Sequence, residues 1–107
     1  MVKIAKENGL KRFIYASSVA VYGQPKKLPA KEDSSLPDPI ASYGIGKMTS
    51  EKYVKYYSER FAMSYACLRY SNIYGPRQGS LGEVGVIGHF IDKIYSTRSI
   101  NVYGAGH

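Results

Sequence analysis

Residues 42–70, SYGIGKMTSEKYVKYYSERFAMSYACLRY, decide the fold of this chain. Several residues recur there at spacings of three and four, namely Tyr43, Lys47, Glu51, Val54 and Tyr57. This period predicts a helix over residues 42–61. The run YACLRY follows at residues 65–70, and its apolar and aromatic side chains predict a strand.

A second predicted strand lies upstream, at residues 12–16, where the run RFIYA indicates a buried strand. Between this strand and the helix, residues 23–39 hold four of the five prolines, which predicts a long surface loop. A strand, a crossover helix and a second strand form a βαβ unit, whose strands are parallel, adjacent and joined in the right-handed sense. The predicted fold class is therefore α/β.

The flanking segments extend this unit. Residues 2–6 have a helical composition, residues 86–96 predict another helix, and residues 100–103 predict a third short strand. Two or three parallel strands do not make an independent sheet, because parallel strands need neighbours on both edges and helices on both faces. We therefore expect the chain to be part of a larger protein.

The composition favours an anionic partner. The chain has 107 residues, which is at most one ordinary domain, and 15 basic residues against 8 acidic ones give a net charge of +7. Nucleic acid, acidic lipid and a phosphorylated small molecule all fit this charge, and the 11 tyrosines could stack on bases. A solvated basic surface is the plainer alternative.

Several classes of protein are disfavoured. Cys67 is the only cysteine, and the two histidines, His89 and His107, offer no metal-ligand spacing, so we expect neither a disulfide nor a metal site. No apolar run approaches the roughly 20 residues that span a bilayer, and no charged-then-apolar leader opens the sequence. We therefore expect a soluble cytoplasmic protein with no membrane partner.

The spacing Tyr43-x-x-x-Lys47 places a phenol and an ammonium one turn apart on one helical face. A nearby positive charge favours the phenolate, which makes a tyrosine a usable general base near neutral pH. The same spacing from Tyr22 to Lys26 spans a glycine and a proline, which prevent a regular helix. An ordinary contact on a helix surface is the alternative for Tyr43 and Lys47.

Two further features surround this pair. Gly44 and Gly46 each cost about 1 kcal/mol in a helix relative to alanine, which predicts the close approach of a ligand or a second backbone, or else a frayed first turn. Ser17 and Ser18 directly follow the first predicted strand, where ligands bind in open α/β sheets, although turn or cap roles are common there. We expect Ser18, the start of the helix and Asn72 to meet at one rim.

Three motifs match those of a known family in order and spacing: Ala16-Ser-Ser-Val-Ala-Val-Tyr-Gly23, Ser42-Tyr-Gly-Ile-Gly-Lys47 and Leu68-Arg-Tyr-Ser-Asn-Ile-Tyr-Gly-Pro-Arg77. With them the chain resembles the extended short-chain dehydrogenase/reductases that act on nucleotide sugars (the NAD-dependent epimerase/dehydratase family), above all the UDP-glucose 4-epimerase-like enzymes. The resemblance covers nearly all of the chain and about the middle third of a family member. It implies a partial Rossmann-like, doubly wound parallel sheet.

The resemblance also implies a mechanism, in which the catalytic residues are Tyr43, Lys47 and Ser18. Tyr43 would take the proton of the sugar 4-hydroxyl while a hydride passes to NAD, and rotation of the 4-keto intermediate before the hydride returns would invert the centre. Lys47 would also hold the nicotinamide ribose, and Ser18 would hydrogen-bond the reacting oxygen. Val19 and Ala20 stand where the related 4,6-dehydratases carry an acidic pair, which disfavours dehydration.

The binding residues implied by the resemblance form two sets. The NAD set is Ala16, Ser17, Tyr43, Lys47 and Tyr70. The nucleotide-sugar set, with a UDP-hexose as the expected partner, is Ser18, Val19, Tyr43, Asn72, Arg77, Asn101, Val102 and Tyr103. The basic residues would then complement phosphate, without any nucleic acid.

The resemblance divides the chain into residues 1–75, the carboxyl-terminal part of the NAD-binding domain, and residues 76–107, the start of the substrate-binding region. The glycine-rich cofactor turn and the carboxyl-terminal tail are expected outside this chain, so the chain alone is expected to be inactive and its full-length parent to be a homodimer. A non-catalytic NAD(P)-binding or sensor protein, another nucleotide-sugar oxidoreductase or dehydratase, and a basic nucleic-acid binder stay open as alternatives.

Overall fold

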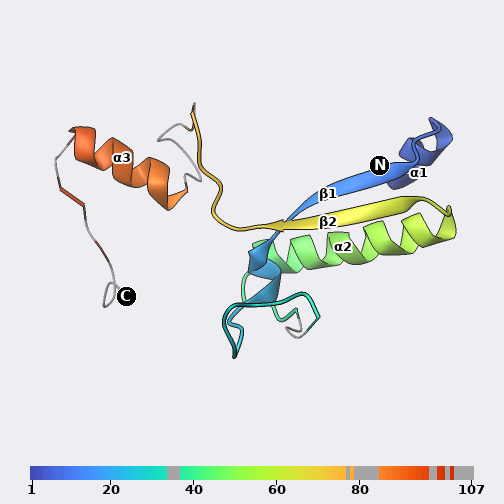
Figure 1. The fold of residues 1–107 in the computed structure, drawn as a ribbon, viewed down its shortest axis with the longest axis horizontal. Helices are drawn as coiled ribbons and strands as arrows, with labels where there is room; N and C mark the ends of the chain where they lie inside the picture. Colours follow the sequence, from blue (N-terminus) through green and yellow to red (C-terminus); the bar gives the residue numbers. More distant parts are fainter. Residues whose placement is uncertain (34–36, 77, 79–84, 97–98, 101, 103–107) are drawn as a thin grey trace. The chain divides into compact units, whose positions relative to one another are not determined.

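The computed structural model describes residues 1–33, 37–76, 78, 85–96, 99–100 and 102. The chain forms two compact units, Met1–Ser71 and Asn72–His107. The first unit contains α1 (Val2–Glu7), β1 (Arg12–Ser18), the 3-10 helix η1 (Val19–Tyr22), α2 (Ser42–Arg60) and β2 (Ser64–Tyr70), and the second contains α3 (Val86–Ser96) (Figure 1). These bounds confirm the three predicted helices and the first two predicted strands.

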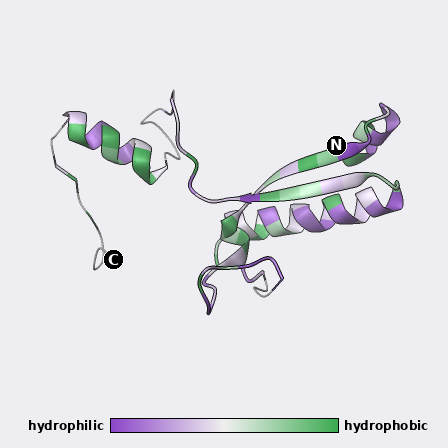
Figure 2. Cartoon of the chain, viewed as in Figure 1, coloured by the Kyte–Doolittle hydropathy of each residue, from purple (hydrophilic) through white to green (hydrophobic). Residues whose placement is uncertain are grey.

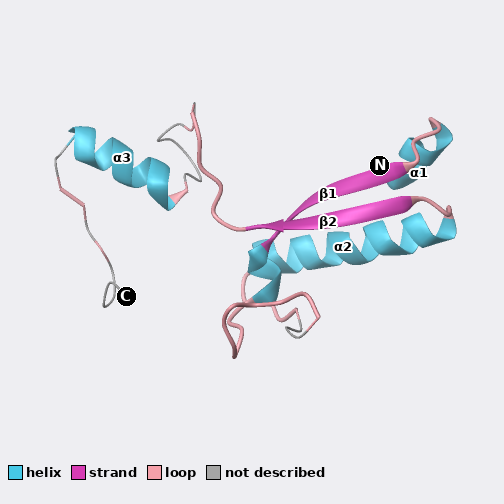
Figure 3. Cartoon of the chain, viewed as in Figure 1, coloured by secondary structure: helices cyan, strands magenta, loops and turns pink. Residues whose placement is uncertain are grey.

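The first unit is built around one βαβ crossover. β1 and β2 pair in parallel, with Arg12 opposite Ser64 at one end and Ser18 opposite Tyr70 at the other. α2 connects the two strands and runs along the sheet (Figure 3). The carboxyl ends of both strands therefore meet at the same end of the sheet, as the predicted βαβ unit requires.

The core of this unit lies between α1, the strands and α2. Its buried residues are Val2, Ala5, Val54 and Met63, and Phe13, Tyr15 and Cys67 pack against them. Burial raises the pKa of the Cys67 thiol, in keeping with its packing against this core. Figure 2 shows hydrophilic residues along much of α2, in keeping with a helix that buries only part of its circumference.

The prediction that the strand at residues 12–16 is buried is wrong for one of its faces. Burial alternates along β1, so that Ser17 is buried whereas Ile14 is 61% exposed. Successive side chains of a strand point to opposite faces, and within the described residues α2 covers only one of these faces. An apolar residue such as Ile14 is thus left on the uncovered face.

The segments outside the βαβ unit match the prediction less fully. Among the described residues of the predicted loop 23–39 there is no helix or strand, which confirms the loop there. Of the predicted third strand, Ile100 and Val102 lie in no strand, and Asn101 and Tyr103 lie outside the described residues. No helix in the described part of the chain has the length and apolar character needed to cross a membrane.

Candidate functional site

The first turn of α2 lies against η1, the turn that follows β1. Gly44 is buried there, and a Cβ added to it would lie 2.5 Å from the carbonyl oxygen of Ala20 and 2.9 Å from the Cβ of Pro39. Glycine permits this approach because it has no side chain. The predicted close approach is confirmed at Gly44, and the second backbone is that of Ala20. At Gly46 no second backbone approaches, since the residue is exposed and its added Cβ would meet no described atom within 4 Å; the approach of a ligand there stays a prediction.

Lys47 joins the first turns of α2 to the end of β1. Its ammonium donates a hydrogen bond of 2.8 Å to the carbonyl oxygen of Ala16. The same nitrogen lies 5.6 Å from the ring centre of Tyr43 and 5.3 Å from that of Tyr15, within the range of cation–π attraction. Tyr43 and Lys47 therefore share one face of α2, as their spacing predicts, and Tyr43 remains 55% exposed.

Ser18 is the last residue of β1 and the N-cap of η1. Its Oγ accepts a hydrogen bond of 3.2 Å from the backbone N–H of Ala20, so the capping role given as an alternative is present. The carbonyl oxygen of Ala20 also lies against Gly44, the residue that follows Tyr43. Ser18 and Tyr43 are therefore both close in sequence to this contact between η1 and α2. Ser17 and Ser18 belong to β1 instead of following it, because the pairing with β2 continues to Tyr70.

The other predicted binding residues divide between the two units. Tyr70 ends β2 as the register partner of Ser18, and Val19 is the exposed first residue of η1. Asn72 and Val102 are exposed residues of the second unit. Three further residues of the predicted set lie outside the described residues: Arg77, Asn101 and Tyr103. The meeting of Asn72 with Ser18 stays a prediction.

We call the place where the end of β1, η1 and the first turns of α2 meet the corner of the unit. A polar network that we did not predict from the sequence lies beside this corner. Glu51 of α2 accepts two hydrogen bonds from Arg69 of β2, at 3.0 Å from Nε and 2.7 Å from Nη2. Ser17 of β1 donates its hydroxyl to the same carboxylate. The ring of Tyr22 lies over the guanidinium of Arg69, 4.7 Å from ring centre to Cζ. The network thus ties α2, both strands and η1 together.

Sequence patterns contained only part of the signal for this network. Glu51 belongs to the helical period, four residues after Lys47. Ser17 and Arg69 become neighbours only through the register of the two strands, in which they are direct partners. Residue spacing within a single segment cannot show such a cross-strand pair.

The pKa values agree with a charged Glu51–Arg69 pair. Burial raises the pKa of Glu51, but the hydrogen bonds from Arg69 and Ser17 and the charge of Arg69 together lower it further, so that it lies below the usual 4.5. The hydrogen bond to Glu51 is the main reason why the pKa of Arg69 is raised. The side chains of Glu51 and Arg69 are only 12% and 20% exposed, so water screens this pair less than a surface pair.

We expect the loss of stability at acid pH to depend on Glu51. Its pKa is lower in the folded chain than in the unfolded chain, so its contribution to stability is complete above the usual pKa of 4.5 and is lost as the pH falls through the folded value. The free energy of unfolding, measured with urea between about pH 3 and pH 7, should therefore fall less steeply toward acid pH in Glu51→Gln than in the unmodified protein. Glu59→Gln is the matched control, since Glu59 forms only an exposed pair with Lys55 at 3.9 Å. An equal loss of stability at acid pH in Glu51→Gln and the unmodified protein would contradict this expectation.

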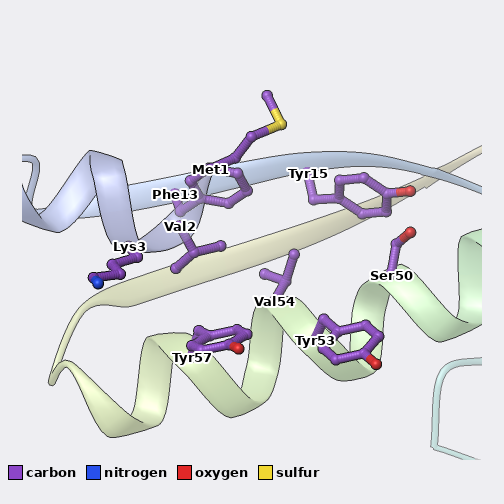
Figure 4. Close-up of a pocket in the computed structure, with 9 residues that line it drawn as sticks. All are labelled: Met1, Val2, Lys3, Phe13, Tyr15, Ser50, Tyr53, Val54 and Tyr57. Carbon is purple, nitrogen blue, oxygen red and sulfur yellow. The ribbon is translucent and has the colours of Figure 1, made fainter.

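An apolar pocket lies elsewhere in the first unit, between α1, β1 and α2 (Figure 4). Figure 4 shows Val2 and Val54 directed toward each other from opposite sides of this pocket, with Phe13 beside Val2. Tyr15 lines it and also contacts Lys47, but neither Tyr43 nor Ser18 lines it. The candidate site is therefore the corner at the strand ends and not this pocket.

In the described part of the chain no group of His, Cys, Asp and Glu is arranged to hold a metal ion.

The chain is similar to known proteins over its whole length. The profile of the NAD dependent epimerase/dehydratase family matches residues 1–107. A putative UDP-glucose 4-epimerase of Methanocaldococcus jannaschii is 39% identical over 100% of this chain and 35% of its own length. The chain thus spans about a third of the length of this relative.

Solved structures show the same likeness. The UDP-glucose 4-epimerase of Thermotoga maritima, crystallised with UDP-glucose, superposes with a TM-score of 0.86 at 32% identity, over 98% of this chain and 34% of that one. The UDP-glucose 4-epimerase of Thermus thermophilus, in complex with NAD, superposes with a TM-score of 0.76 at 30% identity, over 87% of this chain and 30% of that one. The parallel βαβ unit is thus a partial Rossmann-like core, and the chain belongs to the NAD dependent epimerase/dehydratase family.

Proposed function

We propose that this chain is the catalytic part of a nucleotide-sugar 4-epimerase of the UDP-glucose/UDP-galactose type. The observation that carries the proposal is the hydrogen bond from Lys47 to the carbonyl oxygen of Ala16, since it brings the ammonium to the end of β1 while the same nitrogen lies 5.6 Å from the ring centre of Tyr43. The UDP-sugar epimerases among the relatives and solved structures support the substrate class.

In this proposal Tyr43 is the general base. Its phenolate oxygen would accept the proton of the sugar 4-hydroxyl, and its phenol would return that proton to the 4-oxygen in the second half of the reaction. The ammonium of Lys47 would stabilise the negative charge on the phenol oxygen, and its hydrogen bond to Ala16 limits its movement. Ser18 accepts from Ala20 through a lone pair, which leaves its hydroxyl proton for the reacting oxygen.

The donor set at this corner fits the nicotinamide-ribose end of NAD. Lys47 has three N–H donors, only one of which is needed for Ala16, and ribose hydroxyls accept such donors. We assign the cofactor contacts to the predicted set, Ala16, Ser17, Tyr43, Lys47 and Tyr70. Ser17 would contribute through its backbone, because its hydroxyl donates to Glu51. When bound, NAD supplies the hydride acceptor and donor that the sugar C4 requires.

Epimerisation is favoured over dehydration by the residues that follow Ser18. Elimination of a 6-hydroxyl needs an acid and a base beside the reacting carbon. Val19 and Ala20 follow Ser18 in η1, and neither side chain can transfer a proton. Neither residue supplies the acid or the base that dehydration needs, which favours epimerisation by Tyr43.

The proposal includes the rest of the protein. We assign residues 76–107 to the start of the substrate-binding region, and the nucleotide part of the substrate to Asn72, Arg77, Asn101, Val102 and Tyr103. Since the chain spans about a third of its relatives, we expect no turnover from residues 1–107 alone. We also propose a cytoplasmic homodimer for the full-length parent.

The test is an assay of the full-length parent with UDP-galactose and NAD. We expect UDP-glucose to form until the two sugars reach equilibrium, as measured by proton NMR of the anomeric signals. Tight NAD binding without conversion of any UDP-hexose would replace the proposal with a non-catalytic NAD(P)-binding protein. A 4-keto-6-deoxy product would instead indicate a dehydratase.

A further inference from the structure

Glu51 bridges the two strands from the side of α2. Ser17 and Arg69 are direct register partners in the parallel pair, and both side chains reach the same carboxylate. The guanidinium binds both carboxylate oxygens, a fork geometry that fixes orientation as well as distance. The carboxylate of Glu51 thus holds β1, β2 and α2 at one point.

The strand side of this bridge lies within the candidate site. Ser17 stands between Ala16, whose carbonyl oxygen accepts the hydrogen bond of Lys47, and Ser18, which caps η1. A hydrogen bond that holds Ser17 therefore restrains the backbone on both sides of it. Tyr22 extends the restraint to η1, because its ring packs on the guanidinium of Arg69 and the residue is 7% exposed.

The helix side of the bridge lies one turn from the same site. Glu51 follows Lys47 by four residues, so both project from one face of α2. The bond from Lys47 to Ala16 is exposed although Lys47 is half-buried, and a long lysine side chain has many competing rotamers. The side chain of Glu51 is only 12% exposed, and its hydrogen bonds to Ser17 and Arg69 connect α2 to both strands.

We infer that Glu51 is a positioning residue, which keeps Lys47 and the Ala16–Ser18 segment at the separation that the reaction needs. The inference rests on the proposed function. In this role Glu51 would act through Lys47 and through the backbone of Ser17, without contacting the substrate or the cofactor. A displacement of about 1 Å at a reacting group can cost about 100-fold in rate, so a small movement of α2 is enough to matter.

Kinetics of Glu51→Gln in the full-length parent provide the first test. We expect kcat to fall by about 10- to 100-fold while the KM for the UDP-hexose stays within about twofold. Glu59→Gln on the same helix is the matched control and should change neither value, because its pair with Lys55 is exposed. Where Glu51→Gln does not fold, Arg69→Lys keeps the charge but loses the fork, and the same split between kcat and KM is expected.

A double-mutant cycle separates positioning from general destabilisation. If Glu51 acts through Lys47, adding Glu51→Gln to Lys47→Met should lower kcat no further than Lys47→Met alone. Equal fold-losses in both backgrounds would overturn the inference, because they would mean that Glu51 acts independently of Lys47.

A crystal structure of the Glu51→Gln variant of the parent gives a measurement that needs no activity. We expect the 2.8 Å contact between Lys47 Nζ and the Ala16 oxygen to be broken or lengthened beyond hydrogen-bond range. An unchanged contact would overturn the inference even if the parent proves not to be an epimerase. An inactive unmodified parent whose variant loses the contact would refute the proposed function and leave the positioning role of Glu51 supported.

Discussion

Tyr43→Phe is expected to lower the kcat of the full-length parent by about 1,000-fold for the conversion of UDP-galactose to UDP-glucose. The substitution removes only the phenol oxygen, which in the proposed mechanism takes and returns the proton of the 4-hydroxyl. The ring that lies 5.6 Å from the Lys47 ammonium is kept, so the packing of the first turns of α2 should not change. The KM for the substrate should therefore change by less than about threefold.

Tyr56→Phe is the matched control for this prediction. Tyr56 stands on the same helix and is 55% exposed, as Tyr43 is, but it contacts the ring of Tyr57 and not Lys47. We expect Tyr56→Phe to retain full activity. Steady-state assays of the two variants measure this difference. A Tyr43→Phe variant with unchanged kcat, or an equal loss of kcat in both variants, would show that Tyr43 is not the base.

Gly44→Ala is expected to destabilise the full-length parent by about 3 kcal/mol. The added methyl group would lie 2.5 Å from the Ala20 carbonyl oxygen and 2.9 Å from the Pro39 Cβ, so the start of α2 and η1 would have to move apart. Because Tyr43 precedes Gly44 and Ser18 caps η1, the same movement would separate two of the proposed catalytic residues. Urea unfolding measures the loss, and activity at a temperature well below the unfolding transition measures the displacement.

Gly46→Ala, in the same turn of the helix, is expected to have the opposite effect on stability. Its added methyl group would meet no described atom within 4 Å, and alanine is the better helix former by about 1 kcal/mol. We expect this variant to be more stable by about that amount. Should Gly44→Ala match Gly46→Ala in the urea midpoint, the close contact between α2 and the Ala20 carbonyl does not exist in the protein.

Local patterns predicted the elements of this fold well, and the reason is physical. The period of α2 and the apolar and aromatic runs of β1 and β2 are properties of continuous segments, so a window of sequence contains them. The pairing of Tyr43 with Lys47 belongs to the same class, because four residues along a helix always make one turn. The burial of β1 could not be predicted in this way, because the exposure of Ile14 depends on which elements lie against each face of the sheet.

The glycines of α2 show the same division. The sequence predicted that two costly glycines in one turn need a reason, but it treated Gly44 and Gly46 alike. Only the fold distinguishes them, because the carbonyl oxygen of Ala20 is brought to Gly44 by the turn that follows β1. The resemblance of the motifs to a family supplied the roles of Ser18, Tyr43 and Lys47, and these roles stay predictions until the variants are measured.

The amino-acid sequence by itself determined the α/β class, the parallel crossover and the shared helical face of Tyr43 and Lys47, because each depends on spacing along the chain. The tertiary structure alone decided that Lys47 binds the Ala16 carbonyl oxygen and that Glu51 joins Ser17 to Arg69. These contacts join residues that are 18 to 34 positions apart in the chain, and their partners are selected by strand register and helix packing, which no local pattern encodes.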